Sequence, residues 1–202
     1  TESSGVRVST TQRGIKIRAE GRPVSGNIPA QHTVYLVIDC SGSMNGEKLQ
    51  KAKKGAFAFA LDAKIKGYLV GLIQFGSLAT HICEPEKDPQ DIFHHLNELK
   101  IVGSTNMGEG IRLAMSHLEN MGWQRAMLIV TDGSPDSKED ALDAATLAKQ
   151  KGIQIITLGT EDADKEFLQR LASRSDLSAI VSSKNLAEGI RTTAKMLPAK
   201  TP

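Results

Sequence analysis

The sequence is poor in cysteine and in aromatic residues, and it contains no long apolar run. Its two cysteines, Cys40 and Cys83, are too few for a disulfide scaffold, so we expect buried free thiols and a reducing compartment. Aromatic residues make up only 4 % of the chain. With a net charge of +2 and scattered basic residues, this scarcity argues against a nucleic-acid partner.

The chain also lacks the patterns of membrane insertion and secretion. No run of about 18 apolar residues occurs, and no basic segment followed by an apolar stretch opens the chain. We therefore expect no membrane span, no signal peptide and a cytoplasmic location.

What is present fits one α/β domain with a substantial core. Of the 202 residues, 40 % are hydrophobic and 24 % are charged. Residues 1–30 are predicted to form an extension, with a β-hairpin over residues 6–20 and then a loop rich in proline and glycine. The domain itself is predicted over residues 31–197, and residues 198–202 form a tail or linker.

Hydrophobic periodicity alternates between strands and helices along the domain. The predicted strands are 33–38, 68–75, 79–83, 126–131, 153–158 and 177–181. The predicted helices are 46–64, one starting at Asp88, 107–120, 137–151, 164–173 and 185–196. This order predicts a doubly wound, Rossmann-like fold with helices on both faces of a mostly parallel sheet. Residues 79–83 are the exception, since no helix separates them from the preceding strand, and we expect them to form an antiparallel edge strand.

The segment from Val34 to Met44, VYLVIDCSGSM, is the most informative motif. An apolar strand ends at Asp39 and is followed by Ser41 and Ser43. Side chains two residues apart in extended backbone point the same way, and Gly42 permits a sharp turn, so these three groups can converge. Oxygen ligands of this kind suit a hard cation such as Mg2+ or Mn2+.

Two distant segments add oxygens where a strand or loop passes into a helix. Thr105 lies in GSTNM, just before the helix that starts at Met107, and Asp132 follows the strand 126–131. Asp132 could be only a turn residue before Gly133. Its place at the carboxyl end of a strand, where open α/β sheets bind ligands, favours a role in the site.

Together these residues resemble the von Willebrand factor A (VWA) family, whose metal-ion-dependent adhesion site (MIDAS) combines a DxSxS motif with a later threonine and a later aspartate. The resemblance covers about residues 31–197, and every MIDAS position is filled. It implies that Ser41, Ser43 and Thr105 bind the metal through their hydroxyls, while Asp39 and Asp132 mostly hold its bound waters. Among family members the chain is most similar to the intracellular prokaryotic type, which works beside AAA+ ATPases or proteins of the same operon.

A cation held by neutral hydroxyls is poorly neutralised, so an open coordination position favours a carboxylate from another molecule. The sequence therefore predicts a non-catalytic, metal-dependent protein-interaction module whose partner supplies an Asp or Glu. Residues bordering the site are expected to contact the partner: Met44, Asn45, Ser77, Asn106, Met107 and Ser134.

The alternative is a Mg2+-dependent phosphoryl-transfer hydrolase, since such enzymes also place strand-end aspartates around a metal. They need a second acid two residues after the first, and that position holds Ser41. No G-x-S-x-G elbow surrounds Ser41 either, which argues against a serine nucleophile.

The histidines and lysines give weaker signals. His94 and His95 are adjacent and so point to different sides of a helix, while the other histidines stand alone, so we do not expect a zinc site. The other histidines are His32, His81 and His117. A basic face on the first helix is predicted to be ordinary solvated surface; it consists of Lys48, Lys51, Lys53 and Lys54.

Overall fold

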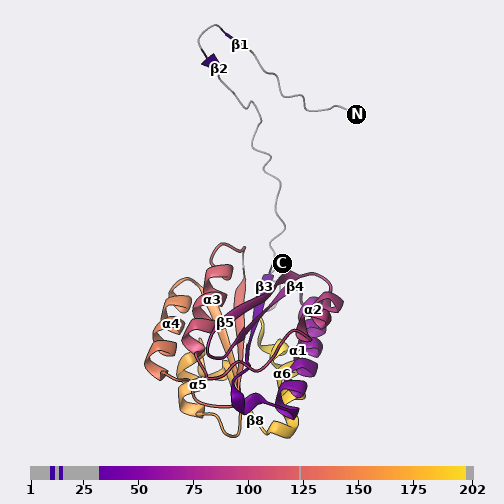
Figure 1. Cartoon of the computed structure of the whole chain (residues 1–202), viewed down its shortest axis with the longest axis vertical. Coiled ribbons are helices and arrows are strands. Elements are labelled where there is room, and N and C mark those ends of the chain that lie inside the picture. The colour runs from indigo at the N-terminus through magenta and orange to yellow at the C-terminus, as the bar shows by residue number, and fades with distance from the viewer. Residues whose placement is uncertain (1–9, 12–13, 16–31, 123, 199–202) are drawn as a thin grey trace.

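A six-stranded sheet forms the centre of the molecule (Figure 1). The computed structural model describes residues 10–11, 14–15, 32–122 and 124–198. The strand order is β5-β4-β3-β6-β7-β8, and every neighbouring pair is parallel except β4 with β5. The strands are β3 (His32–Asp39), β4 (Tyr68–Phe75), β5 (Ala79–Glu86), β6 (Arg125–Thr131), β7 (Ile153–Thr160) and β8 (Ser178–Val181). This confirms the predicted mostly parallel sheet with an antiparallel edge strand.

Helices cover both faces of the sheet, which confirms the doubly wound fold. One layer contains α1, α2 and α6, and the other contains α3, α4 and α5 (Figure 1). The α-helices are α1 (Glu47–Ile65), α2 (Pro89–Leu96), α3 (Met107–Leu118), α4 (Lys138–Gln150), α5 (Lys165–Leu171) and α6 (Leu186–Thr192). Short 3-10 turns are η1 (Gly42–Met44), η2 (Ser175–Leu177), η3 (Ser183–Asn185) and η4 (Thr193–Met196).

The core lies on both faces of strand β3, which is buried along its whole length. Val34, Leu36 and Ile38 pack into the cluster beneath α1, α2 and α6. The alternate residues Tyr35 and Val37 pack into the cluster beneath α3, α4 and α5. A strand buried on both faces is largely apolar, here from Val34 to Ile38. Its polar residues lie at the two ends, with Asp39 at the carboxyl edge of the sheet.

Local sequence signals fix several helix starts. The Asp88 side chain accepts a hydrogen bond from the Gln90 amide at 3.1 Å, with Pro89 at the first helical position. The Ser137 hydroxyl accepts one from the Asp140 amide at 3.2 Å. Both caps satisfy amides that have no partner within the helix, and they place the starts of α2 and α4 where the sequence predicts helices to begin.

Strand β5 is longer than the predicted 79–83 and ends at Glu86. Its pairing with β4 contains two register shifts. Pro85 interrupts the alternation there, and an edge strand tolerates such residues because one of its sides needs no hydrogen bonds.

Of the predicted hairpin over residues 6–20, Thr10–Thr11 (β1) pairs antiparallel with Gly14–Ile15 (β2). The rest of that hairpin and residues 199–202 lie outside the described residues, so the domain boundaries stay predictions. Within the described part of the chain, no helix is long and apolar enough to cross a membrane. Cys40 and Cys83 are buried free thiols, and burial raises the pKa of each to about 12.

Candidate metal centre

The carboxyl ends of strands β3 and β6 bring two distant segments together. β3 delivers Asp39, and the chain then turns through η1, which contains Ser43. Asp132 follows β6 directly. Because β3 and β6 pair in parallel, with Ile38 opposite Val130, both aspartates emerge at the same edge of the sheet.

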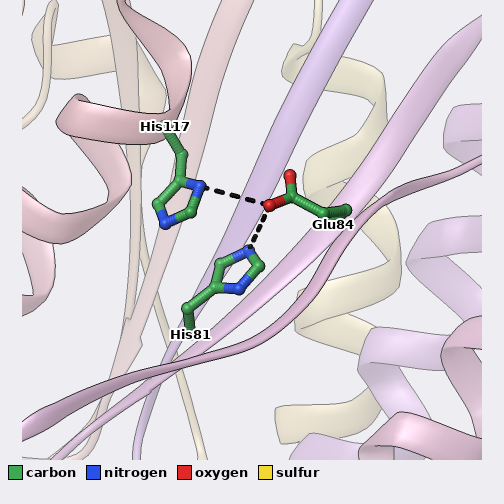
Figure 2. Close-up of side chains that lie close together, drawn as sticks. All are labelled: His81, Glu84 and His117. Carbon is green, nitrogen blue, oxygen red and sulfur yellow. Dashed lines mark ion pairs between the residues drawn. The ribbon is translucent and has the colours of Figure 1, made fainter.

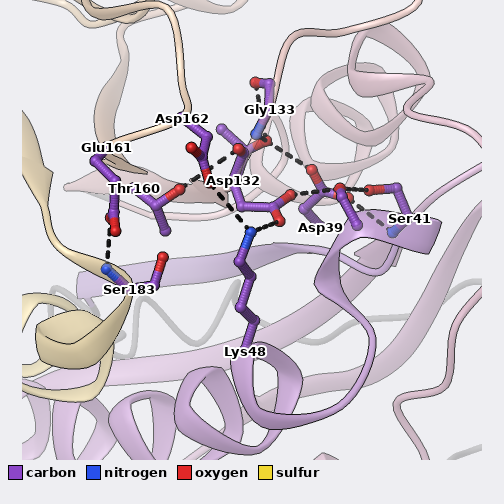
Figure 3. A network of polar contacts seen from close by, with 11 residues as sticks. Asp39, Ser41, Lys48, Asp132, Gly133, Thr160, Glu161, Asp162 and Ser183 are labelled. Carbon is purple, nitrogen blue, oxygen red and sulfur yellow. Dashed lines mark hydrogen bonds and ion pairs between the residues drawn. The ribbon is translucent and has the colours of Figure 1, made fainter.

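Hydrogen bonds connect four of the five predicted residues, Asp39, Ser41, Ser43 and Asp132 (Figure 3). The hydroxyl oxygens of Ser41 and Ser43 lie 3.1 Å apart. The Ser43 hydroxyl donates to one carboxylate oxygen of Asp132 at 2.7 Å, and the Ser41 amide donates to Asp39 at 2.8 Å. Oxygen atoms of Ser41, Ser43 and Asp132, from segments that follow two neighbouring strands, therefore lie close together.

Asp39 is a fully buried carboxylate. Burial raises the pKa of its carboxyl, and hydrogen bonds from the Thr131 hydroxyl and from Ser41 oppose that rise. The Thr131 hydroxyl donates to Asp39 at 2.6 Å. Sequence analysis missed Thr131, although extending the parallel register by one residue places it beside Asp39.

Thr105 lies in the neighbouring loop and is positioned through its backbone. The Gly42 amide donates to the Gly103 carbonyl at 2.8 Å, which ties this loop to the DxSxS turn. The Thr105 amide donates to the Asp136 carboxylate at 3.0 Å. Among the described hydrogen bonds, none links the Thr105 hydroxyl to the side chains of the other four predicted residues. Thr105 therefore lies next to the hydrogen-bonded group but is not part of it.

Lys48 contradicts the prediction for the basic face of the first helix. Its ammonium group lies 2.7 Å from Asp132 and 3.4 Å from Asp162 (Figure 3). The hydrogen bond to Asp132 raises the pKa of Lys48. The prediction was wrong because α1 starts directly after the DxSxS turn, so its first turn lies against the sheet edge. Lys51, one turn further on, instead pairs with Glu47 at the surface.

The predicted partner-contacting residues divide into two groups. Asn45, Ser77 and Ser134 are exposed, and half-buried Asn106 caps α3 by accepting a hydrogen bond from the Glu109 amide. Met44 and Met107 are fully buried in the two core clusters, so placing them at the surface was wrong. Both are apolar residues at the sheet edge whose side chains turn inward to gain burial.

The model of the von Willebrand factor type A domain matches residues 33–193. The chain belongs to the VWA family. VWA domains are typically metal-dependent protein-interaction modules.

Individual relatives of this VWA domain are distant. A "UPF0353 protein" from Mycolicibacterium gilvum is 27 % identical over 185 residues, which cover 74 % of this chain and 55 % of that protein. The chain thus spans about half the length of the curated relatives it matches, and these relatives are bacterial.

Two solved structures share the fold of this chain. The von Willebrand domain of the pilus tip protein Mfa5 from Porphyromonas gingivalis is 13 % identical with a TM-score of 0.74, covering 83 % of this chain and 95 % of that one. Proximal thread matrix protein 1 from the mussel byssus, described "with zinc occupied MIDAS motif", is 20 % identical with a TM-score of 0.63. That alignment covers 82 % of this chain and 46 % of the mussel protein.

The chemistry available at this edge of the VWA domain is that of oxygen ligands. Ser41 and Ser43 offer neutral hydroxyls, and Asp39 and Asp132 offer carboxylates. Among the described hydrogen bonds, the Ser41 hydroxyl contacts the Ser43 hydroxyl and no histidine.

Proposed function

We propose that this VWA domain holds Mg2+ or Mn2+ at a complete MIDAS and uses the ion to bind a carboxylate of a protein partner. The hydrogen-bonded chain from Ser41 through Ser43 to Asp132 carries the proposal, because it brings hard oxygen donors from two strands to one point. Ser41, Ser43 and Thr105 would hold the cation, with Asp39 and Asp132 holding its waters. The zinc-occupied MIDAS of the mussel protein supports a divalent ion in this fold.

The donor set explains why such an ion would recruit a partner. Hydroxyls carry no charge, so a dication that they hold keeps most of its charge. Mg2+ prefers six oxygen ligands and retains waters, so a partner Asp or Glu can replace one water without rebuilding the site. Ser43 is exposed, so the site is accessible from solvent.

We infer that the domain acts without catalysis. The position two residues after Asp39 holds Ser41 in place of a second acid, and the Ser41 hydroxyl contacts another hydroxyl. An assay with a generic phosphate ester and a generic carboxyl ester checks this inference. Robust Mg2+-dependent turnover that Asp39→Asn abolishes would support the hydrolase alternative instead.

The exposed polar residues around the site form the surface that we assign to the partner. They are Asn45, Ser77 and Ser134, with Asn106 at the start of α3. The resemblance to prokaryotic members points to an AAA+ ATPase-type or operon-linked protein as the partner. It also points to the cytoplasm as the location of this domain.

Capture of partners from the native lysate tests the proposal. Immobilised wild-type chain is compared with Asp132→Ala, each with Mg2+ and with EDTA. The surface variant Asp143→Ala is the control, because Asp143 is an exposed acid on α4. We expect a partner that is lost with EDTA and with Asp132→Ala but retained with Asp143→Ala. Recovery of every partner regardless of metal contradicts the proposal.

A further inference from the structure

Two histidines and a glutamate converge beside the edge strand β5 (Figure 2). His81 and Glu84 come from β5, and His117 comes from the last turn of α3. One Glu84 oxygen lies 3.7 Å from Nε2 of His81 and 3.6 Å from Nδ1 of His117. The three candidate ligand atoms all lie within 4.8 Å of one another.

An irregularity in β5 creates this cluster. His81 and Cys83 pair with Ile73 and Leu72, which are adjacent, so β5 contains one extra residue at Ile82. In a regular strand, residues three apart face opposite sides of the sheet. The bulge instead lets Ile82 and Cys83 both pack against the α1 side, and it turns His81 and Glu84 to the α3 side together.

Tyr35 forms the buried floor of the cluster. Its hydroxyl donates to the second Glu84 oxygen at 3.2 Å and lies 3.1 Å from Nε2 of His81. The imidazole rings of His81 and His117 stack with centroids 4.0 Å apart.

We propose that His81, Glu84 and His117 form a second metal site, selective for a transition-metal dication such as Zn2+. Two imidazole nitrogens and one carboxylate oxygen are a ligand set that zinc accepts, with a fourth position left for water. Imidazole suits zinc and its neighbours in the periodic table, whereas Mg2+ prefers oxygen. The Tyr35 hydroxyl orients the glutamate in the way that outer hydrogen bonds orient metal ligands.

The candidate ligand atoms are spaced slightly more widely than those around a bound zinc ion, and the stacked imidazole rings would have to turn toward the ion. Zinc bonds of about 2.0–2.1 Å place tetrahedral ligand atoms about 3.3 Å apart. The observed separations from Glu84 are 3.7 and 3.6 Å. All three side chains are partly exposed, with 24 %, 61 % and 26 % of the side-chain surface of His81, Glu84 and His117 accessible, so they can rotate and an ion can enter.

The second site is separate from the MIDAS. Tyr35 lies four residues before Asp39 on β3, roughly 13 Å along the strand. His117 follows Met107 at the MIDAS end of α3 by ten residues, roughly 15 Å along the helix. An ion held here would link edge strand β5 to α3, whose first turn follows the Thr105 loop.

Substitution with Co2+ tests the proposal directly, because Co2+ in a nitrogen- and oxygen-ligated site of low symmetry gives strong visible absorption. The wild-type chain is compared with His117→Ala, His117→Gln and Glu84→Gln. His95→Ala is the matched control, since His95 also contacts a glutamate, Glu98 at 2.8 Å, but has no third ligand among the residues that the structure describes. Asp132→Ala removes the MIDAS acid and separates the two sites.

We expect absorption bands in the wild type, His95→Ala and Asp132→Ala, and their loss in the cluster variants. Zn2+ should displace the Co2+, with an affinity that falls by more than about tenfold in the cluster variants, since even loss of an outer partner costs that much. Far-UV circular dichroism checks that each variant is folded. If His117→Ala does not fold, His117→Gln replaces it in the comparison. Three results would overturn the proposal. The bands could persist in both Glu84→Gln and the folded His117 variant, they could vanish in Asp132→Ala, or they could be absent from the wild type.

Discussion

The ammonium group of Lys48 lies 2.7 Å from one carboxylate oxygen of Asp132, while the other oxygen of Asp132 accepts a hydrogen bond from Ser43 at 2.7 Å. The Asp132 side chain is fully buried, whereas a quarter of the Lys48 side-chain surface is accessible. A lysine of the protein thus supplies positive charge at the place where we propose that a metal ion acts. The Lys48 ammonium group and the metal ion should therefore compete for the electrostatic interaction with the Asp132 carboxylate.

Replacing Lys48 should move stability and metal affinity in opposite directions. In EDTA, Lys48→Gln should lower the free energy of unfolding by roughly 1–3 kcal/mol, because Asp132 loses a charged hydrogen bond. Mg2+ affinity should rise by roughly tenfold, because about 1.4 kcal/mol of repulsion is removed. Chemical denaturation and calorimetric titration measure the two effects. Lys51→Gln, which breaks only a surface pair with Glu47, should change neither.

Removing the Thr105 hydroxyl should weaken Mg2+ binding without unfolding the domain. Thr105→Val keeps the shape of the side chain, and the backbone bonds to Asp136 do not depend on the hydroxyl. We expect an affinity loss of about tenfold or more, and a change in unfolding free energy in EDTA within about 0.5 kcal/mol. Ser104→Ala at the neighbouring exposed residue is the control. Unchanged Mg2+ affinity in Thr105→Val would exclude Thr105 from the site.

Gly76 should be intolerant of any side chain. A Cβ atom at this position would lie 2.2 Å from the Val102 carbonyl oxygen, which is backbone and cannot rotate away. Gly76→Ala should therefore cost about 1–3 kcal/mol of stability, and it should weaken Mg2+ binding because the displaced segment leads to Thr105. At Gly133 a Cβ atom meets nothing within 4 Å, so Gly133→Ala should behave like the wild type in thermal unfolding and in titration.

The sequence allowed the fold to be predicted where local signals and periodicity agree. Three such signals each predict one feature of the fold. Asp88 and Ser137 mark helix starts, the apolar run before Asp39 marks a buried strand, and the absence of a helix before residues 79–83 marks an antiparallel edge strand. Ser41 was predictable because side chains two residues apart in extended backbone point the same way. Ser43 lies instead in the 3-10 turn η1, and it is this turn that brings its hydroxyl beside that of Ser41.

What sequence reasoning missed depends on contacts between distant segments. His81 and Glu84 have the wrong spacing for one face of a regular strand, and only the extra residue at Ile82 brings them together. His117 joins them from another element, so no spacing rule could reveal the cluster. Lys48 was misassigned because helical periodicity describes one helix and carries no information about the neighbouring sheet edge.

The central claim is that Ser41, Ser43, Thr105, Asp39 and Asp132 bind a hard dication. The measurement that tests it most directly is the thermal unfolding midpoint with and without Mg2+, after EDTA treatment and dialysis, for the wild type, Asp132→Ala and Asp143→Ala. At a Mg2+ concentration 100 times the dissociation constant, we predict a rise of roughly 5–10 °C for the wild type and Asp143→Ala, and none for Asp132→Ala. An equal rise in all three proteins, or no rise in the wild type, would contradict the account.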